Sequence, residues 1–259
     1  MSRWDWYQAT LSESCRDAVI GELLARYDLS EVRPGRPKNG YESGADIARG
    51  DEVVAKVWWG GNPGLHVIGT GEQAPSVADA IRAVERQHRV TRCDACLDWV
   101  ETGLFDRMSA GLIAYAEGRG VKINQQGDWV RGESRTLYLG SRSSPVQLVL
   151  YEKGYESGGD PAWVRLEARI RPAKDAKSRV ASWEPHDCWR ASRWVVQALE
   201  AIGFEKLQPY SIGTVRKPTD EERARAVLLS QYGAIIQRWA EDVGTYEALG
   251  AVLRETLEA

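Results

Sequence analysis

The sequence predicts an α+β fold with a central, mainly antiparallel sheet, helices packed on one face of it, and a C-terminal helical hairpin. Three observations support this prediction. Short stretches of alternating polar and apolar residues recur up to residue 171, segments with apolar residues at helical spacing separate some of them, and the chain after residue 187 is almost continuously helical in pattern. This order of elements fits a parallel doubly wound fold less well, and no glycine-rich phosphate loop is present.

The first hundred residues predict two helices and five strands. WDWYQATL alternates as a strand does, and a helical pattern follows over residues 12–27. Extended segments over 41–48, 52–59 and 64–69 predict a meander, because a glycine-rich turn joins the last two as a hairpin. A helix over 76–87 then leads directly into a strand over 88–100.

The rest of the chain predicts a third helix over 104–117, four more strands, and a helical tail. The strands are expected over 121–125, 135–140, 146–153 and 163–171, and the tail helices over 188–202, 221–243 and 246–258. We place the domain boundary at residue 217. Residues 1–216 then form the main domain, and residues 217–259 form a helical hairpin whose apolar face packs against it.

Composition restricts the classes of function. The 259-residue chain has a net charge of −3, so contact with nucleic acid must depend on a local basic surface. Four cysteines and three histidines are few for zinc, and Cys93 and Cys96 have no second pair at metal-ligand spacing. No apolar run reaches the length of a signal peptide core or a membrane span, which predicts a cytoplasmic protein without membrane contact.

Three of the predicted strands place chemically active side chains on one face, because alternate residues of a strand point the same way. The polar sets are Arg92, Asp94, Cys96 and Asp98; Gln147, Val149, Tyr151 and Lys153; and Trp163, Arg165, Glu167, Arg169 and Arg171. Carboxylates bind Mg²⁺ or Mn²⁺, arginine and lysine bind phosphate, and tyrosine is a competent nucleophile toward a phosphodiester. The alternative is an ordinary solvated sheet face rich in ion pairs.

The third of these strands and the segment after it are unusually basic. Six arginine and lysine residues stand among the fifteen positions from 165 to 179, against two acidic residues. Such a local excess is suited to a phosphate backbone. It supplies most of our candidate DNA-binding residues, which are Arg92, Arg165, Arg169, Arg171, Lys174 and Lys177.

Motifs on these strands resemble the replication initiation factor family, the rolling-circle replication initiators of plasmids and filamentous phages. The residues are RTLYLGSRSS, a strand ending in Y-E-K, and RLEAR, in that order, with RCDACLD and GLHVIGTG upstream. The resemblance covers roughly residues 4–202. It implies a palm-like sheet similar to that of the HUH nickases, in which residues 1–216 form the catalytic domain.

The activity that the resemblance implies is a metal-dependent nicking of origin DNA, either single-stranded or extruded as a cruciform. A tyrosine attacks the scissile phosphate, which leaves a 5′-phosphotyrosine and a free 3′-hydroxyl that primes synthesis. Mg²⁺ or Mn²⁺ is the expected cofactor, a host helicase is a candidate partner, and the cytoplasm of a bacterial host is the expected location. The sequence leaves open whether the protein is a monomer or a homodimer.

Tyr151 matches the nucleophile of the family, with Lys153 on the same face to steady the phosphate or the phenolate. Tyr138 and Tyr155 are rival candidates. The spacing from Tyr151 to Tyr155 resembles that of initiators with two tyrosines, but that arrangement needs a helix, which Gly154 is expected to interrupt.

Asp94 and Glu167 are the expected metal ligands, with Asp98 and His66 as further candidates. The sequence departs here from an HUH motif, because only one histidine stands in Leu65-His66-Val67 and carboxylates must supply much of the coordination. The alternative for His66 is a hydrogen-bonded structural residue. The arginines also have an alternative role, in which Arg165 and Arg169 form ion pairs with Glu167 and Asp94 and do not bind phosphate.

Besides a regulatory or structural protein of a mobile element, which would show no metal-dependent cleavage, two other functions remain open from the sequence. The same sheet face suits a non-catalytic single-stranded nucleic-acid-binding protein of a mobile element, with some of the eleven tryptophans stacked on unpaired bases. It also suits a metal-dependent nuclease that forms no covalent intermediate. Covalent attachment of DNA to Tyr151 distinguishes the nickase from both.

Overall fold

The computed structural model describes residues 1–204 and 220–258 of the chain. It divides into two compact units, Met1–Thr214 and Val215–Ala259. The expected packing of the C-terminal helices on the main domain stays a prediction. None of the described helices combines the length and the apolar character that a bilayer span requires.

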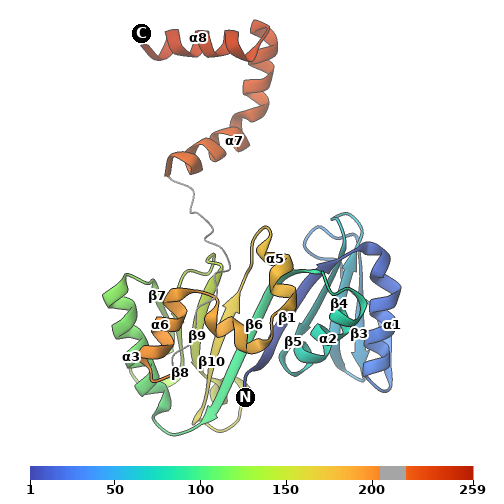
Figure 1. Ribbon diagram of the computed structural model, residues 1–259, viewed down its shortest axis with the longest axis vertical. Coiled ribbons are helices and arrows are strands. Elements are labelled where there is room, and N and C mark those ends of the chain that lie inside the picture. Colours follow the sequence, from blue (N-terminus) through green and yellow to red (C-terminus); the bar gives the residue numbers. More distant parts are fainter. Residues whose placement is uncertain (205–219, 259) are drawn as a thin grey trace. The chain divides into compact units, whose positions relative to one another are not determined.

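The first unit is built on one open sheet of ten strands, in the order β2-β3-β4-β5-β1-β6-β10-β9-β8-β7 (Figure 1). Every pair of neighbouring strands is antiparallel. The strands are β1 (Arg3–Leu11), β2 (Ser30–Pro34), β3 (Ser43–Arg49), β4 (Glu52–Trp59), β5 (Leu65–Thr70), β6 (Arg89–Val100), β7 (Ile123–Asp128), β8 (Glu133–Leu139), β9 (Val146–Glu152) and β10 (Trp163–Ile170).

The longer helices of this unit gather over one side of the sheet, as Figure 1 shows. The helices of the unit are α1 (Arg16–Arg26), α2 (Ala74–Val84), α3 (Leu104–Arg119), α4 (Lys153–Ser157), α5 (Ala176–Arg179) and α6 (Arg193–Ala201), with short 3₁₀ turns η1 (Glu13–Cys15), η2 (Gly71–Gln73), η3 (Val180–Ser182) and η4 (Pro185–Arg190). The predicted α+β class, with an antiparallel sheet and helices on one face, is confirmed.

The apolar sides of the strands build one continuous core under these helices. In β9 the alternation points Leu148 and Leu150 into the core, where both are fully buried. In β10 it does the same for Leu166 and Ile170. The opposite side chains of both strands are therefore free to carry a functional site.

The sheet contains a repeated topology that the sequence did not reveal. In the first half, β1 and α1 are followed by the meander β2–β5, and β5 returns to pair with β1. In the second half, β6 and α3 are followed by the meander β7–β10, and β10 returns to pair with β6. The pairing of β1 with β6 joins the two halves at the centre of the sheet.

Several predicted bounds differ from the structure for local reasons. The edge strand β2 was not predicted, because its sequence SEVRP is short and mostly exposed and ends in a proline. The helix predicted over 76–87 is α2 (Ala74–Val84), with a proline in its first turn. The helix predicted over 188–202 is divided into η4 and α6, because Ser192 caps α6 by accepting a hydrogen bond from the Val195 backbone N–H.

The second unit is a pair of helices, α7 (Asp220–Val243) and α8 (Tyr246–Glu258), as the sequence predicted. The break falls at Gly244, which has a φ of +101° that other residues rarely adopt. Among the described side chains of this unit, Ala240 and Leu249 are buried, and several large apolar residues of α7 are exposed.

Candidate active site

The polar face predicted for β6, β9 and β10 forms rows of side chains across the sheet. In one row Asp98, Arg165, Tyr151 and Thr136 lie opposite one another on four successive strands. The next row, two residues along each strand, holds Cys96, Glu167, Val149 and Tyr138. A third holds Asp94, Arg169 and Gln147. The rows are about 7 Å apart, which is two residues of a strand.

A cavity of about 470 Å³ opens on this face, and we call it the tyrosine cavity. The side chains that line it come from β1, β6, β8, β9, α4 and β10. They are Asp5, Trp6, Arg92, Asp94, Ser134, Thr136, Tyr138, Val149, Tyr151, Glu152, Lys153, Tyr155, Glu156, Glu167 and Arg169. The candidate nucleophile, two of the candidate metal ligands and two of the candidate phosphate-binding arginines thus lie in one place.

Tyr151 and Glu167 are joined by a short hydrogen bond. The Tyr151 hydroxyl donates to Oε1 of Glu167 over 2.5 Å, along the diagonal between β9 and β10. Burial, followed by the negative charge and the hydrogen bond of Glu167, raises the pKa of Tyr151 well above its usual range. The phenol therefore stays protonated at neutral pH unless a base removes its proton.

Asp94 is almost fully buried and is held by two arginines. Nε of Arg92 donates to Oδ1 of Asp94 over 3.0 Å, and Nε of Arg169 lies 3.8 Å from Oδ2. The other side of Arg169 binds Glu167, with Nη2 2.7 Å from Oε2. Burial raises the pKa of Asp94 to about 6, although the arginines act in the opposite direction. Arg169 therefore stands between the two carboxylates.

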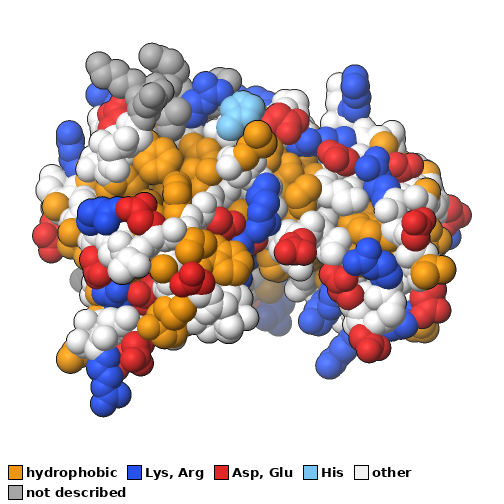
Figure 2. Space-filling model, turned by 90° about the horizontal axis from the view of Figure 1, so that it is seen from below, with side chains coloured by type: hydrophobic (Ala, Val, Ile, Leu, Met, Phe, Trp, Pro, Cys, Tyr) orange, Lys and Arg blue, Asp and Glu red, His pale blue; other side chains and the backbone are white. Residues whose placement is uncertain are grey.

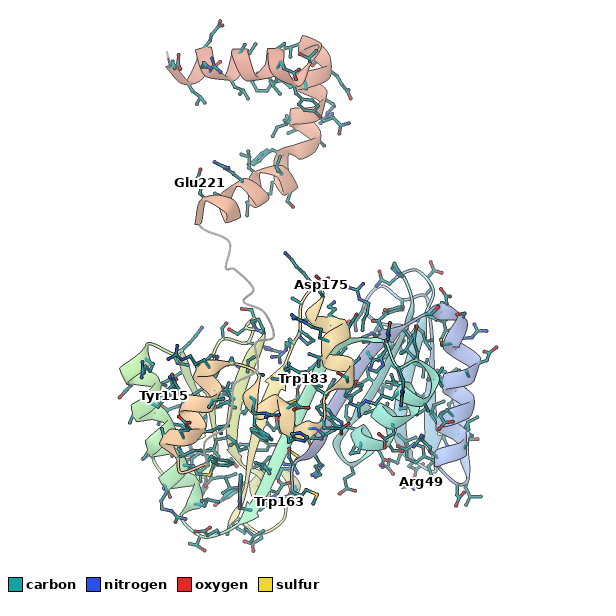
Figure 3. The ribbon with its side chains drawn as sticks, in the orientation of Figure 1. Arg49, Tyr115, Trp163, Asp175, Trp183 and Glu221 are labelled. Carbon is teal, nitrogen blue, oxygen red and sulfur yellow. The ribbon has the colours of Figure 1, made fainter. Side chains whose placement is uncertain are left out.

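Asp98 and Arg165 form a separate network at the side of the tyrosine cavity. Nε of Arg165 donates to Oδ1 of Asp98 over 2.7 Å, and Nη1 donates to Asp5 over 2.7 Å. Trp163, labelled at the start of β10 in Figure 3, also donates to Asp98. Asp98 does not line the tyrosine cavity, so its expected convergence with Asp94 and Glu167 is not seen. The ion-pair alternative from the sequence expected Arg165 to pair with Glu167 or Asp94. In the structure Arg165 pairs with Asp98 and Asp5 instead.

His66 lies in the first half of the sheet, on β5, and does not line the tyrosine cavity. Its Nδ1 is 3.1 Å from the Thr10 hydroxyl, and its ring stacks with Tyr41 and Trp58. Burial lowers the pKa of His66 to about 4, and the charge of Lys177 acts in the same direction. These contacts fit the alternative role for His66, that of a hydrogen-bonded structural residue.

Lys153 and Tyr155 belong to α4, the short helix after β9. Gly154 lies inside α4 and does not interrupt it, but Tyr151 belongs to β9, so Tyr151 and Tyr155 do not share the helix that a two-tyrosine arrangement needs. A Cβ at this position would come within 1.8 Å of the backbone oxygen of Asp160, so the turn requires glycine for space. Nζ of Lys153 pairs with Glu156 over 2.8 Å, and Tyr155 lines the tyrosine cavity. The helix brings both residues to the same cavity as Tyr151.

The remaining basic candidates lie toward the far end of β10. Arg171 lies just beyond the strand and lines a neighbouring cavity. Lys174 is exposed, with a φ of +50°, and lies next to Asp175, which Figure 3 labels before α5. Lys177 lines a third cavity with Thr10 and His88. The structure does not bring Lys174 and Lys177 to the tyrosine cavity.

Sequence reasoning missed two residues of β1 in the tyrosine cavity. A bulge between Trp4 and Trp6 turns both Asp5 and Trp6 toward it, although strict alternation would separate them. Burial and the charge of Glu167 raise the pKa of Asp5. The guanidinium of Arg92 lies 4.2 Å from the centre of the Trp6 ring. The sequence Trp4-Asp5-Trp6 placed an acidic residue in a predicted strand, but nothing in this sequence predicts the bulge.

The donors in this cavity suit a hard divalent cation. Asp94 and Glu167 offer carboxylate oxygens, and Mg²⁺ commonly takes one or two carboxylates together with substrate phosphates and water. Across residues 1–204 and the described part of the tail, no three His, Cys, Asp or Glu side chains are grouped as metal ligands. The pair of carboxylates fits a cation that is completed by substrate, and both are engaged by arginine in this structure.

Comparison with known proteins finds a family model that matches the second half of the sheet. Residues 88–201 match the family model described as replication initiation factor, which confirms the resemblance expected from the motifs. The matched segment is the second half of the sheet and its helices, and it contains Tyr151, Glu167 and Asp94.

The fold is similar to a structure titled "Structure of Rolling Circle Replication Initiator Protein from Geobacillus stearothermophilus". The TM-score is 0.52 and the identity 24%, over 70% of this chain and 77% of that chain. This likeness confirms the fold. No curated protein sequence matches the chain significantly.

Proposed function

We propose that this protein initiates rolling-circle replication by nicking one strand of origin DNA, with Tyr151 as the nucleophile. The observation that carries the proposal is the 2.5 Å hydrogen bond from Tyr151 to Glu167, inside a cavity lined by both carboxylates and cations. The family match over residues 88–201 supports it, because that segment contains Tyr151, Glu167 and Asp94.

Glu167 is the base in this mechanism. Since the pKa of Tyr151 is raised, an unassisted phenolate is scarce, and Oε1 of Glu167 is already in place to accept the proton. The phenolate oxygen then bonds to the scissile phosphorus, the bond from phosphorus to the 3′-oxygen breaks, and that oxygen takes a proton from water. The products are a 5′-phosphotyrosine and a free 3′-hydroxyl.

Charge stabilisation comes from residues around the tyrosine. Lys153, Arg92 and Arg169 line the tyrosine cavity and can bind the phosphate oxygens as negative charge develops. Asp94 and the Oε2 atom of Glu167 would hold a Mg²⁺ or Mn²⁺ ion in place of their arginine contacts. A bound cation of this kind supplies Lewis-acid polarisation of the scissile phosphate.

The reverse reaction closes the strand. A 3′-hydroxyl that enters the tyrosine cavity gives its proton to hydroxide or water and attacks the phosphotyrosine, the bond from phosphorus to the tyrosine oxygen breaks, and the protonated Glu167 returns its proton to the Tyr151 oxygen. This step uses the same residues in the opposite order, as microscopic reversibility requires. The protein would act in this way both as nickase and as strand transferase.

The test is the formation of a covalent adduct. The protein is incubated with single-stranded oligonucleotides that tile its own replicon, with Mn²⁺ or Mg²⁺, and adducts are resolved on a denaturing gel. We expect an adduct with one origin sequence, no adduct with Tyr151→Phe, and a normal amount with Tyr155→Phe. A Tyr151→Phe protein that still forms the adduct would rule out this mechanism, and cleavage with no adduct would favour a nuclease without a covalent step.

A further inference from the structure

A second cavity, of about 430 Å³, lies beside the tyrosine cavity, and we call it the basic cavity. Five cationic residues line it, from β6, β10 and the segments next to β7, β8 and β10: Arg92, Lys122, Arg142, Arg169 and Arg171. No acidic residue lines it, although the chain as a whole has a net charge of −3. Such a concentration of positive charge in a concave site attracts anions.

Three of these cations have no carboxylate partner. Arg92 and Arg169 pair with Asp94 and Glu167 on the side of the tyrosine cavity. Within the part of the chain that the structure describes, no carboxylate oxygen lies within 4.0 Å of Lys122, Arg142 or Arg171. Their charge is available to a ligand.

Arg171 is the most informative of the three. Its Nη1 atom is buried and has no hydrogen-bond partner. Burial lowers the pKa of Arg171, and the positive charge of Arg92 acts in the same direction. A buried donor without a partner is costly in a folded protein, because it has lost water and gained nothing in exchange. An anion in the basic cavity would remove this cost.

The two cavities are contiguous. Arg92, Tyr138 and Arg169 line both of them. Along the chain, Glu167 and Arg171 are four residues apart, which corresponds to about 13 Å of extended backbone. A polyanion whose scissile phosphate lies at Tyr151 therefore reaches the basic cavity within a short distance.

We propose that the basic cavity binds a backbone phosphate of the same DNA strand, next to the scissile phosphate, with Arg171, Arg142 and Lys122 as its contacts. The inference rests on the proposed function, since it takes the tyrosine cavity as the site of the scissile phosphate. It adds two residues, Lys122 and Arg142, that were not among the DNA-binding candidates from the sequence. It leaves Lys174 and Lys177 outside the subsite.

The test measures binding and not cleavage. The affinity of the full chain for a fluorescent oligothymidylate is measured by anisotropy in EDTA at several salt concentrations. We expect Arg171→Gln and Arg142→Gln each to weaken binding about tenfold, and the slope of log K against log salt to fall by about 0.7, as loss of one single-strand phosphate contact requires.

The matched control is Arg119→Gln. Arg119 is an exposed arginine near the end of α3, a helix that packs on the opposite side of the sheet, so the variant has the same change in net charge. We expect less than a twofold change in affinity. If Arg171→Gln and Arg142→Gln bind the oligonucleotide as tightly as Arg119→Gln, the subsite is wrong. Should Arg171→Gln fail to fold, the exposed pair Lys122→Gln and Arg142→Gln carries the test.

A second arm separates a DNA phosphate from a free anion. Inorganic phosphate is titrated into the wild-type protein and Arg142→Gln by calorimetry. Phosphate binding that depends on Arg142, combined with unchanged oligonucleotide binding in the variants, would overturn the proposal in favour of a free-anion site. If the variants weaken oligonucleotide binding but the wild-type protein forms no adduct with any origin sequence, the subsite stands and the nickase function fails.

Discussion

At the scale of single residues, the function depends on where the proton of Tyr151 goes. Glu167 raises the pKa of Tyr151 and also accepts its hydrogen bond, so one carboxylate both suppresses the free phenolate and offers a route to it. In the proposed mechanism this pairing keeps Tyr151 protonated until a phosphate is positioned beside it. Arg169 has a similar double contact, with Glu167 on one side and Asp94 on the other.

Replacement of Glu167 by glutamine tests its role as the base. The amide keeps the shape of the side chain but cannot take a proton, so we expect the rate of adduct formation with Glu167→Gln to fall about 10²- to 10⁴-fold. Single-turnover kinetics on an origin oligonucleotide measures this. Glu152→Gln is the matched control, because Glu152 is also buried, but its carboxylate accepts hydrogen bonds from Arg135 whereas the Tyr151 hydroxyl donates to Glu167. Equal losses in both variants would contradict the assignment.

The raised pKa of Asp94 predicts how metal binding depends on pH. A carboxylate must be ionised to bind a divalent cation, and half of Asp94 is protonated at about pH 6. Affinity for Mn²⁺ should therefore fall about tenfold for each pH unit below 6 and level off above 7. Titration followed by electron paramagnetic resonance measures the free ion. The Asp98→Asn protein should keep this pH profile, and the Asp94→Asn protein should bind Mn²⁺ weakly at every pH. An affinity for Mn²⁺ that does not change with pH in the wild-type protein would contradict a role for Asp94 as a metal ligand.

At the scale of elements, the alternation of polar and apolar residues in β6, β9 and β10 was enough to predict the polar face of the sheet, on which Tyr151, Glu167 and Asp94 all lie. Alternation reports which side of a strand a residue occupies, but not where it lies along the neighbouring strand. For this reason the alternation did not predict that Asp98, which is on the expected face, pairs with Arg165 and does not line the tyrosine cavity. The bulge at Asp5 and the helical turn around Gly154 depend on tertiary contacts, so they could not be predicted.

The position of His66 in β5 predicts a pH dependence of stability. Its pKa is lowered to about 4 in the folded protein, so the neutral ring contributes stability above the ordinary pKa of about 6.5. That contribution is lost as the pH falls through about 4, and amounts to about 3 kcal/mol at most. His66→Gln should be the less stable protein at pH 7, by a margin that shrinks toward pH 4. Denaturant unfolding at each pH measures the margin, and a constant margin would contradict a buried neutral histidine.

At the scale of the whole molecule, charge and topology together limit where DNA can bind. Acidic and basic side chains are interspersed on the face that Figure 2 shows, as a net charge of −3 suggests. Among the described residues, five cationic side chains and no acidic residue line the basic cavity. The two halves of the sheet also differ on this face, since His66 lies opposite Thr10 and Trp58 in the first half and Arg165 lies opposite Asp98 and Tyr151 in the second.

The first unit should fold without the second. Its core is one continuous cluster drawn from residues 4–199. We expect a protein of residues 1–214 to unfold cooperatively, with a Tm within about 5 °C of the full chain. Calorimetry of both proteins provides the comparison. A truncated protein without a cooperative transition would show that the helical pair contributes to the core.

The most direct test of the central claim is to locate the covalent bond. The adduct with origin DNA is digested with a nuclease and a protease, and the modified peptide is sequenced by tandem mass spectrometry. The account predicts a nucleotide attached through its 5′-phosphate to the Tyr151 oxygen, in a peptide from β9 and α4. Attachment at Tyr138 or Tyr155, with Tyr151 unmodified, would contradict it.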